Sequence, residues 1–229
     1  MLMTRTFRLS GLLAALLCLG PLTGLHAQDA PAAPAPKIKS GKKDQLVTIH
    51  VVQGDVVLGD IKLLLYDQTP LHKANFLKKA KSGFYDGTTF HRVIPNFMVQ
   101  GGDANSKNDD PADDGLGQPD APTIPAEIRP ELSHKRGAVA AARQGDFANP
   151  KRASSSSQFY IVQNNTGTPH LDRQYTVFGQ VVQGQAVVDK IALAPTTAPD
   201  RPTTPIRMTM KVEKISKKKV AKEYGFEYQ

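Results

Sequence analysis

The chain has 229 residues, 40% of them hydrophobic, and a formal net charge of +8. That length supports one substantial core and is too short for two comfortable domains. Beyond the N-terminal segment no apolar run is long enough to cross a bilayer, and the basic surplus near the C-terminus has no basic face interleaved with aromatic residues, so composition does not favour nucleic-acid binding.

Residues 1–27 have the pattern of a secretory signal peptide. Arg5 and Arg8 give a positive start, an apolar stretch covers 9–19, and Ala27 offers a small residue for cleavage before the next position. We therefore expect an exported protein of the periplasm. An uncleaved segment that anchors the protein in the membrane, facing the periplasm, is the alternative.

Cleavage after Ala27 would remove Cys18, the only cysteine, and leave no disulfide, thiol nucleophile or cysteine metal site. It would also remove two arginines and lower the formal charge to 27 − 21 = +6. The Ala/Pro-rich residues 28–44 are typical of a flexible spacer. At the other end, we expect the basic residues 216–229 to form a solvated tail.

Residues 45–67 contain two runs of β-branched and leucine residues divided by a Gly-Asp pair, which predicts a strand, a turn and a second strand. A helix is expected next, with Thr69 as its N-cap, Pro70 in its first position and Gly83 just past its end. The positions that repeat at helical spacing, and so predict its buried face, are Leu71, Ala74, Leu77 and Ala80, with Phe76 alongside.

The stretch TTFHRVIPNFMVQGG returns to strand character, and the polar residues 104–124 predict a long surface loop. GAVAAAR, SQFYIVQ and YTVFGQVVQG are further strand candidates, residues 185–192 are a short helix candidate, and PIRMTMKVEKI alternates as a half-buried strand does. Many short strands with only two helices favour a mainly β protein with a closed, mostly antiparallel sheet.

Several kinds of reaction chemistry have no signature in the chain. There is no G-x-S-x-G elbow, no G-x-G-x-x-G and no P-loop. The histidines beyond the signal segment are not paired at metal-ligand spacing: His50, His72, His91, His134 and His170. We therefore expect an enzyme that works with no metal, no cofactor and no covalent nucleophile.

Four segments together resemble the cyclophilin-type peptidyl-prolyl cis–trans isomerases. They are FHRVIPNFMVQGGD, GAVAAAR, SSQFYIV and HLDRQYTVFGQVVQG, in that order, and the resemblance covers residues 45–215. It implies a closed eight-stranded antiparallel β-barrel capped by two α-helices. It also implies an isomerase that acts on X-Pro peptide bonds in polypeptides that fold after export.

The resemblance assigns catalysis to Arg92 and Gln100. A peptide bond to proline rotates over a barrier of about 18–20 kcal/mol because of amide resonance, and no covalent bond has to break. In the twisted amide the prolyl nitrogen regains a lone pair, so a fixed donor nearby stabilises that state selectively. Arg92 is that donor by the family pattern, and Gln100 is expected to hold Arg92 in position and to contact the substrate backbone.

The other site residues also come from the resemblance. An apolar proline pocket is expected from Phe97, Met98, Tyr160 and Leu171, and His91 is expected as a wall of the site that shuttles no proton. Gln158 and the backbone near Ala142 and Arg143 are expected to bind the residues before the proline. The remaining substrate-binding positions depart from the best-known eukaryotic members at the pocket rim: His170 and Tyr175.

His170 stands where those members have Trp, which supplies apolar area and an N–H donor to cyclosporin, so we expect weak cyclosporin binding. The expected partners are proline-containing polypeptides, with no nucleic acid, and the expected state is a monomer. Two rival functions stay open: a non-catalytic binder or holdase for prolyl peptides, and an envelope scaffold that acts through the basic C-terminal tail.

Overall fold

The computed structural model describes residues 41–108, 110–118 and 120–228. The predicted signal segment 1–27 and most of the predicted spacer lie outside these residues. The last two spacer positions, Lys43 and Asp44, already belong to strand β1 (Lys43–Gln53). Within the described part, no helix has the length and apolar character to cross a membrane.

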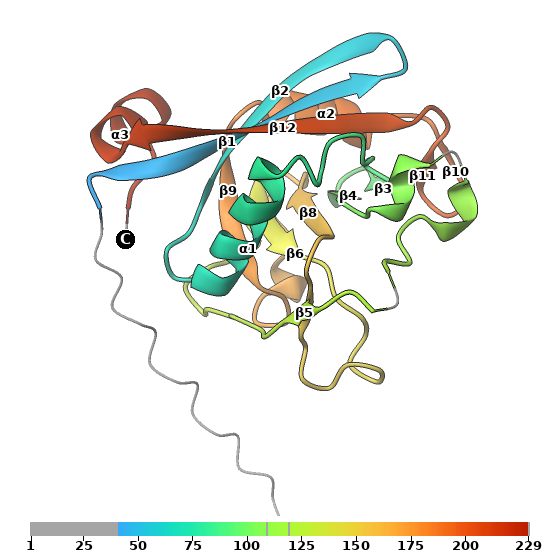
Figure 1. The fold of residues 1–229 in the computed structure, drawn as a ribbon, viewed down its shortest axis with the longest axis horizontal. Helices are drawn as coiled ribbons and strands as arrows, with labels where there is room; N and C mark the ends of the chain where they lie inside the picture. The colour runs from blue at the N-terminus through green and yellow to red at the C-terminus, as the bar shows by residue number, and fades with distance from the viewer. Residues whose placement is uncertain (1–40, 109, 119, 229) are drawn as a thin grey trace, which may run out of the picture. The chain divides into compact units, whose positions relative to one another are not determined.

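Eight antiparallel strands form one curled sheet in the order β12-β1-β2-β9-β6-β8-β4-β3 (Figure 1). Alternating side chains from both halves of the sheet fill the interior, together with Phe76 of the first helix. The bounds of the strands after β1 are β2 Val56–Leu65, β3 Arg92–Ile94, β4 Met98–Gly101, β6 Ala138–Ala141, β8 Phe159–Val162, β9 Val177–Gln183 and β12 Ile206–Ser216.

The protein is mainly β and its main sheet is antiparallel, as expected. The expectation of a closed barrel overstates the closure of that sheet. Strands β3 and β12 are the two edges and do not pair as strands. The segment just before β3 spans part of this gap, since Phe90 N donates to Ile206 O at 2.8 Å and Met208 N donates to Thr88 O at 2.9 Å. Closure therefore depends on irregular backbone, which strand periodicity does not reveal.

Two predicted helices are present, α1 (Pro70–Lys81) and α2 (Gln185–Ala192). Gly83 has φ +73° just past the end of α1, as expected of a residue that ends a helix. The predicted loop 104–124 is partly structured: it holds the 3₁₀ turns η1 (Asn105–Lys107) and η2 (Pro111–Asp113) and strand β5 (Thr123–Ile124). That strand pairs with β7 (Ser154–Ser155).

The N-terminus of α1 is capped from a distant part of the chain. Thr69 occupies the N-cap position but its side chain makes no capping bond; instead the carboxylate of Glu127 accepts from Leu71 N at 3.1 Å and from His72 N at 3.0 Å. His72 Nδ1 adds a third bond to Glu127 at 2.7 Å.

This contact turns His72 inward and leaves Leu71 and Ala74 exposed. The predicted buried face of α1 is therefore wrong at those two positions.

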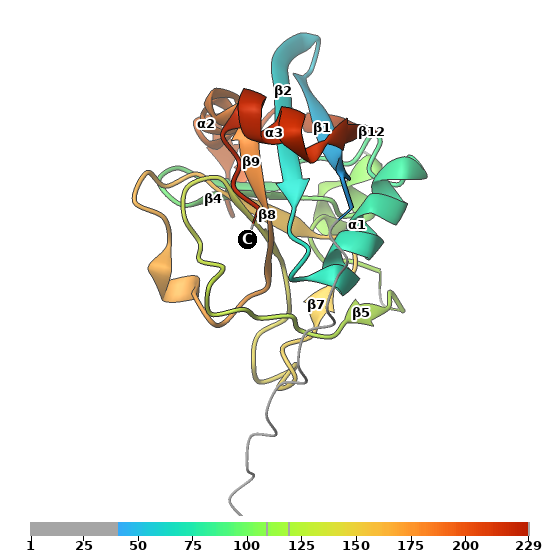
Figure 2. The same ribbon diagram turned by 90° about the vertical axis from the view of Figure 1, so that its left-hand side faces the viewer.

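The C-terminal residues are not a solvated tail. Helix α3 (Lys217–Tyr224) crosses the end of β12 and β1 (Figure 2), and its Ser216 N-cap accepts from Lys219 N. Val220 is 0% exposed and packs in one cluster with Leu46 and Leu64. Beyond the helix, Phe226 stacks on Tyr66 with ring centroids 6.0 Å apart. The segment is part of the fold.

Val220→Ala is expected to lower the free energy of unfolding by about 2 kcal/mol, because it removes two buried methyl groups and leaves a small cavity. Urea denaturation of the full chain measures this. Val57→Ala is the matched control, since Val57 is 61% exposed and its loss should change stability by less than about 0.5 kcal/mol. Equal effects of the two substitutions would show that α3 does not pack as described.

Candidate active site

The hairpin β3–β4 places the two predicted catalytic residues opposite each other. Arg92 is the register partner of Gln100, and Ile94 is the partner of Met98. Paired residues point to the same face of a sheet, and alternate residues share that face. The turn of the hairpin holds Asn96 at φ +59°, a left-handed conformation that asparagine tolerates better than most residues. The side chains of the two pairs, Arg92 with Gln100 and Ile94 with Met98, therefore share one face of the sheet. It is the outer face, opposite the core that contains Val93 and Val99.

The same face continues across the neighbouring strands. Tyr160 in β8 pairs with Gln100 on one side and with Ala140 in β6 on the other. This outer face carries an apolar cluster, which we call the pocket cluster. Its members are buried Met98, Leu132, Ala138, Ala140, Tyr160, Val162 and Val177, with partly buried Tyr66, Ile94, Phe97, Leu171 and Tyr175.

The structure thus brings together five predicted pocket residues: Phe97, Met98, Tyr160, Leu171 and Tyr175. A sixth, His170, follows Pro169 in the 3₁₀ turn η3 (Pro169–Leu171) and stacks on Phe97 with ring centroids 5.8 Å apart. The cluster is apolar and aromatic, as a binding surface for a proline ring requires.

Arg92 stands at the edge of this cluster with a half-exposed side chain, 44% accessible. Its Nε lies 3.4 Å from Oδ2 of Asp200. Gln100 was expected to hold Arg92, but no hydrogen bond joins the two among the described residues. The Gln100 amide instead donates to Oε1 of Gln158 at 3.1 Å. The ion-pair partner of Arg92 is Asp200, which lies 108 positions away and has no local sequence signal.

The side chain of Gln158 is held by two further hydrogen bonds. Its Nε2 donates to Asp103 at 3.3 Å and to the carbonyl of Gly115 at 3.1 Å. The path of the chain to Asp103 needs Gly102, which has φ +86° and where a Cβ would lie 2.7 Å from the carbonyl oxygen of Ser157. The two glutamines thus form a rigid polar strip beside the pocket cluster.

Ala142 and Arg143 follow β6 at the far side of the cluster. Both main-chain groups of Ala142 are hydrogen-bonded. Its N–H donates to the carbonyl of Gln158 at 3.1 Å, and its carbonyl accepts from Ser155 N at 2.8 Å. Arg143 differs: its side chain is 4% exposed, while the whole residue is partly exposed, so the accessible part is main chain. Of these two predicted backbone contacts, Arg143 is the one open to a substrate.

His91 is not grouped with the other predicted site residues. It is buried and lines a separate cavity of about 60 Å³ with Asp114 and Arg201. Burial lowers the pKa of His91 to about 4, so its ring is neutral near pH 7. The ring lines this cavity rather than the pocket cluster, so the expectation that His91 forms a wall of the site is wrong.

A buried polar chain supports the floor of the pocket cluster and was missed in the sequence. Asp172 accepts from His134 Nδ1 at 2.8 Å, and His134 Nε2 lies 3.0 Å from the hydroxyl of Tyr160. Burial lowers the pKa of His134 despite Asp172, so the neutral ring accepts from Tyr160. The buried Tyr160 hydroxyl thereby has a hydrogen-bond partner.

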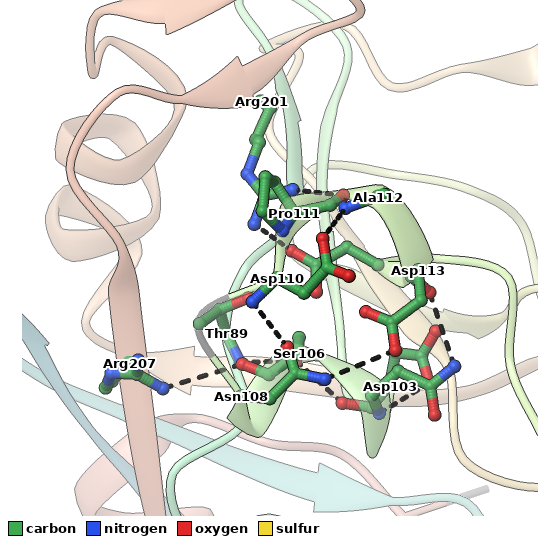
Figure 3. Close-up of polar contacts among 12 residues, drawn as sticks. Thr89, Asp103, Ser106, Asn108, Asp110, Pro111, Ala112, Asp113, Arg201 and Arg207 are labelled. Carbon is green, nitrogen blue, oxygen red and sulfur yellow. Dashed lines mark hydrogen bonds and ion pairs between the residues drawn. The ribbon is translucent and has the colours of Figure 1, made fainter.

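The loop that carries Asp200 is held by contacts with β3 and with the 104–124 segment. It connects β10 (Thr196–Thr197) to β11 (Arg201–Pro202), and Val93 N donates to the carbonyl of Asp200 at 2.8 Å. The next residue, Arg201, reaches into the 104–124 segment (Figure 3), where it contacts Asp114 and donates to Pro111 O at 2.6 Å. The segment around Asp200 is thus anchored by hydrogen bonds on two sides.

Asp200→Ala is expected to lower kcat/KM for X-Pro isomerisation about three- to fivefold, mainly through kcat, because an exposed ion pair contributes up to about 1 kcal/mol. Kinetics on a short X-Pro peptide measures this. If Asp200 acts only through Arg92, the substitution has no further effect in an Arg92→Ala background. A further loss there would contradict the positioning role.

A curled antiparallel sheet that presents an arginine beside an apolar aromatic cluster defines the class of prolyl isomerases with a cyclophilin fold. In the described part of the chain, no three His, Cys, Asp or Glu side chains are placed to hold a metal ion.

Comparison with known proteins agrees with this class. The family model for cyclophilin-type peptidyl-prolyl cis-trans isomerases matches residues 46–212. A peptidyl-prolyl cis-trans isomerase of Acinetobacter baylyi is 37% identical over 66% of this chain and 79% of its own length, and one of Arabidopsis thaliana is 39% identical over 71% of this chain and 91% of its own.

A putative bifunctional phosphatase/peptidyl-prolyl cis-trans isomerase of Streptococcus pyogenes is 38% identical, but the alignment spans only 36% of that protein. Among solved structures, a cyclophilin-type isomerase of Cryptosporidium parvum superposes with a TM-score of 0.61 at 28% identity, over 74% of this chain and 98% of its own. The chain belongs to the family of cyclophilin-type peptidyl-prolyl cis-trans isomerases, and the enzyme class expected from the sequence is confirmed.

Proposed function

We propose that the protein accelerates X-Pro isomerisation in exported polypeptides as they fold, with Arg92 stabilising the twisted amide. The observation that carries this proposal is the placement of Arg92, oriented by Asp200, at the edge of the pocket cluster. The guanidinium is charged and has rigid donors, and its half-exposed position leaves donors available to a peptide.

The physical basis is selective binding of one state. Planar cis and trans amides have little basicity at nitrogen, whereas the twisted amide has a localised lone pair there. A donor fixed next to the proline ring therefore binds the twisted form more strongly than either planar form, which lowers the barrier. The pocket cluster holds the ring by apolar contact, and the exposed main chain of Arg143 binds the residue before the proline.

Exchange spectroscopy by NMR on a short X-Pro peptide tests the activity. Catalytic amounts of protein should accelerate cis–trans exchange without shifting the cis:trans ratio. Binding of the peptide without acceleration would support the rival function, a holdase for prolyl peptides, and would overturn the proposal. A Cryptosporidium parvum structure determined in the presence of the dipeptide Ala-Pro makes short prolyl peptides a reasonable first ligand.

Export to the periplasm rests on the N-terminal sequence alone. Mass spectrometry of the protein from periplasmic and membrane fractions should find a chain that begins at Gln28. An intact N-terminus in the membrane fraction would favour the anchored alternative, and recovery in the cytoplasm would overturn the proposed location. Sedimentation of the purified protein tests the proposed monomeric state.

Cyclosporin is expected to inhibit weakly. His170 stands at the rim, stacked on Phe97, and its small polar ring offers less apolar area than the Trp that it replaces. His170→Trp should therefore increase the affinity for cyclosporin, while isomerisation of a short peptide stays largely unchanged. Inhibition of the unsubstituted protein at sub-micromolar cyclosporin would contradict this expectation.

A further inference from the structure

We propose that Phe147, on the loop between β6 and β7, contacts an apolar side chain of the client polypeptide three to five residues before the proline. This deepens the proposed isomerase function and rests on it. Phe147 has a relative exposure of 105%, so its ring lies in solvent and does not pack in the core. An exposed aromatic ring is a common anchor in protein interfaces.

The loop holds Phe147 in a defined place. The carboxylate of Asp146, its neighbour, bridges two arginines: Arg143 at 2.5 Å and Arg152 at 2.8 Å. Asn149 closes the return of the loop with two bonds to the main chain of Ala153, at 2.8 and 3.0 Å. The loop backbone that carries Phe147 is thus already ordered, so little backbone entropy is lost when a ligand binds there.

The base of this loop rests on the segment that forms one side of the pocket cluster. Arg143 Nε donates to Gln174 O at 3.0 Å, and its guanidinium lies 4.5 Å from the ring centroid of Tyr175. Arg152 adds a bond to Arg173 O at 3.4 Å. The tip extends away from the sheet, past β5 and β7 (Figures 1 and 2). Phe147 is thus presented on a platform that adjoins the site.

Chain geometry sets the part of the client within reach. Phe147 lies four positions after Arg143 in the chain, and a stretch of that length spans at most about 14 Å. An extended peptide advances about 3.3 Å per residue, so the same distance covers about four residues of a bound polypeptide. Since the Arg143 main chain is the proposed contact for the residue before the proline, Phe147 can meet a side chain three to five positions before it.

Two peptides with the same Ala-Ala-Pro core test the inference. One is short, and the other extends further toward its N-terminus and carries leucine four positions before the proline. The kcat and KM of isomerisation are measured for both by NMR exchange. Phe147→Ser is expected to lower kcat/KM about five- to tenfold for the long peptide, through KM, and to leave the short peptide unchanged.

Matched variants separate this contact from general effects. Phe147→Leu should restore most of the activity on the long peptide, because it returns apolar area. Val57→Ser removes an exposed apolar side chain, 61% accessible, on the β1–β2 hairpin. That hairpin lies on the opposite side of the sheet from this loop in Figures 1 and 2, so the substitution should change neither peptide. Unchanged thermal unfolding of each variant should show that the fold is intact.

An equal effect of Phe147→Ser on both peptides, or no effect on either, would overturn the inference. In both cases activity of the unsubstituted protein on the short peptide leaves the proposed function standing. Inactivity of the unsubstituted protein on both peptides would overturn the proposed function and this inference with it.

Discussion

Arg92→Ala is expected to lower kcat/KM for X-Pro isomerisation about 100- to 1,000-fold, the usual cost of losing one preorganised donor at a developing charge. The loss should lie in kcat, because the guanidinium interacts most strongly with the twisted amide and the pocket cluster still binds the proline ring. NMR exchange with saturating peptide measures kcat directly.

The fold should survive this substitution. The Arg92 side chain is half-exposed and its ion pair with Asp200 is partly solvated, so thermal unfolding should change little. Arg92→Lys is the matched control: it keeps the charge but loses the rigid fork of donors, and it should recover only part of the activity. An exchange rate equal to that of the unsubstituted protein would show that Arg92 has no catalytic role.

Glu127→Ala is expected to lower the free energy of unfolding by about 3 kcal/mol. The carboxylate accepts three hydrogen bonds, from Leu71 N, His72 N and His72 Nδ1, and its loss leaves donors at the start of α1 without a partner in a largely buried place. Glu127→Gln, which keeps one acceptor oxygen, should cost about half as much. Urea denaturation measures both.

The contribution of Glu127 should depend on pH. Burial raises the pKa of its carboxyl, and the hydrogen bonds from His72 and the α1 backbone outweigh burial, so the pKa lies below the ordinary value of 4.5. The stabilisation is therefore complete above about pH 4.5 and is lost as the pH falls through the folded-state pKa. The difference between Glu127→Ala and the unsubstituted protein should shrink as the pH falls below 4.5; a difference independent of pH would contradict the assignment.

Local pattern was sufficient for much of the secondary structure. The hairpin of β1 and β2, the ends of α1, helix α2 and the alternation in β12 all follow from side-chain periodicity and turn residues. The resemblance carried by the motif around Arg92 also implied a pocket of Phe97, Met98, Tyr160 and Leu171, and the structure groups these residues in one cluster.

Where local pattern failed, a distant residue decided the outcome. Leu71 has the right spacing for the buried face of α1, yet His72 is buried because Glu127, 55 positions away, binds it. Val220 lies in a lysine-rich segment typical of a tail, yet it is buried because it meets Leu46 and Leu64. Neither partner could be identified from the neighbours of the residue in the chain.

The amino-acid sequence by itself determined the family, because the four motifs that carry the resemblance are contiguous. The resemblance also supplied Arg92 as the proposed catalytic residue and most residues of the pocket cluster as the proposed proline surface. Only the tertiary structure decided that Asp200 pairs with Arg92, that His134 and Asp172 form a hydrogen-bonded chain to Tyr160, and that His91 lines a cavity apart from the pocket cluster. The reason is physical: side chains far apart in the chain become neighbours when strands pair. Periodicity within one strand shows which side chains share a face, but not which distant residues that face will contact.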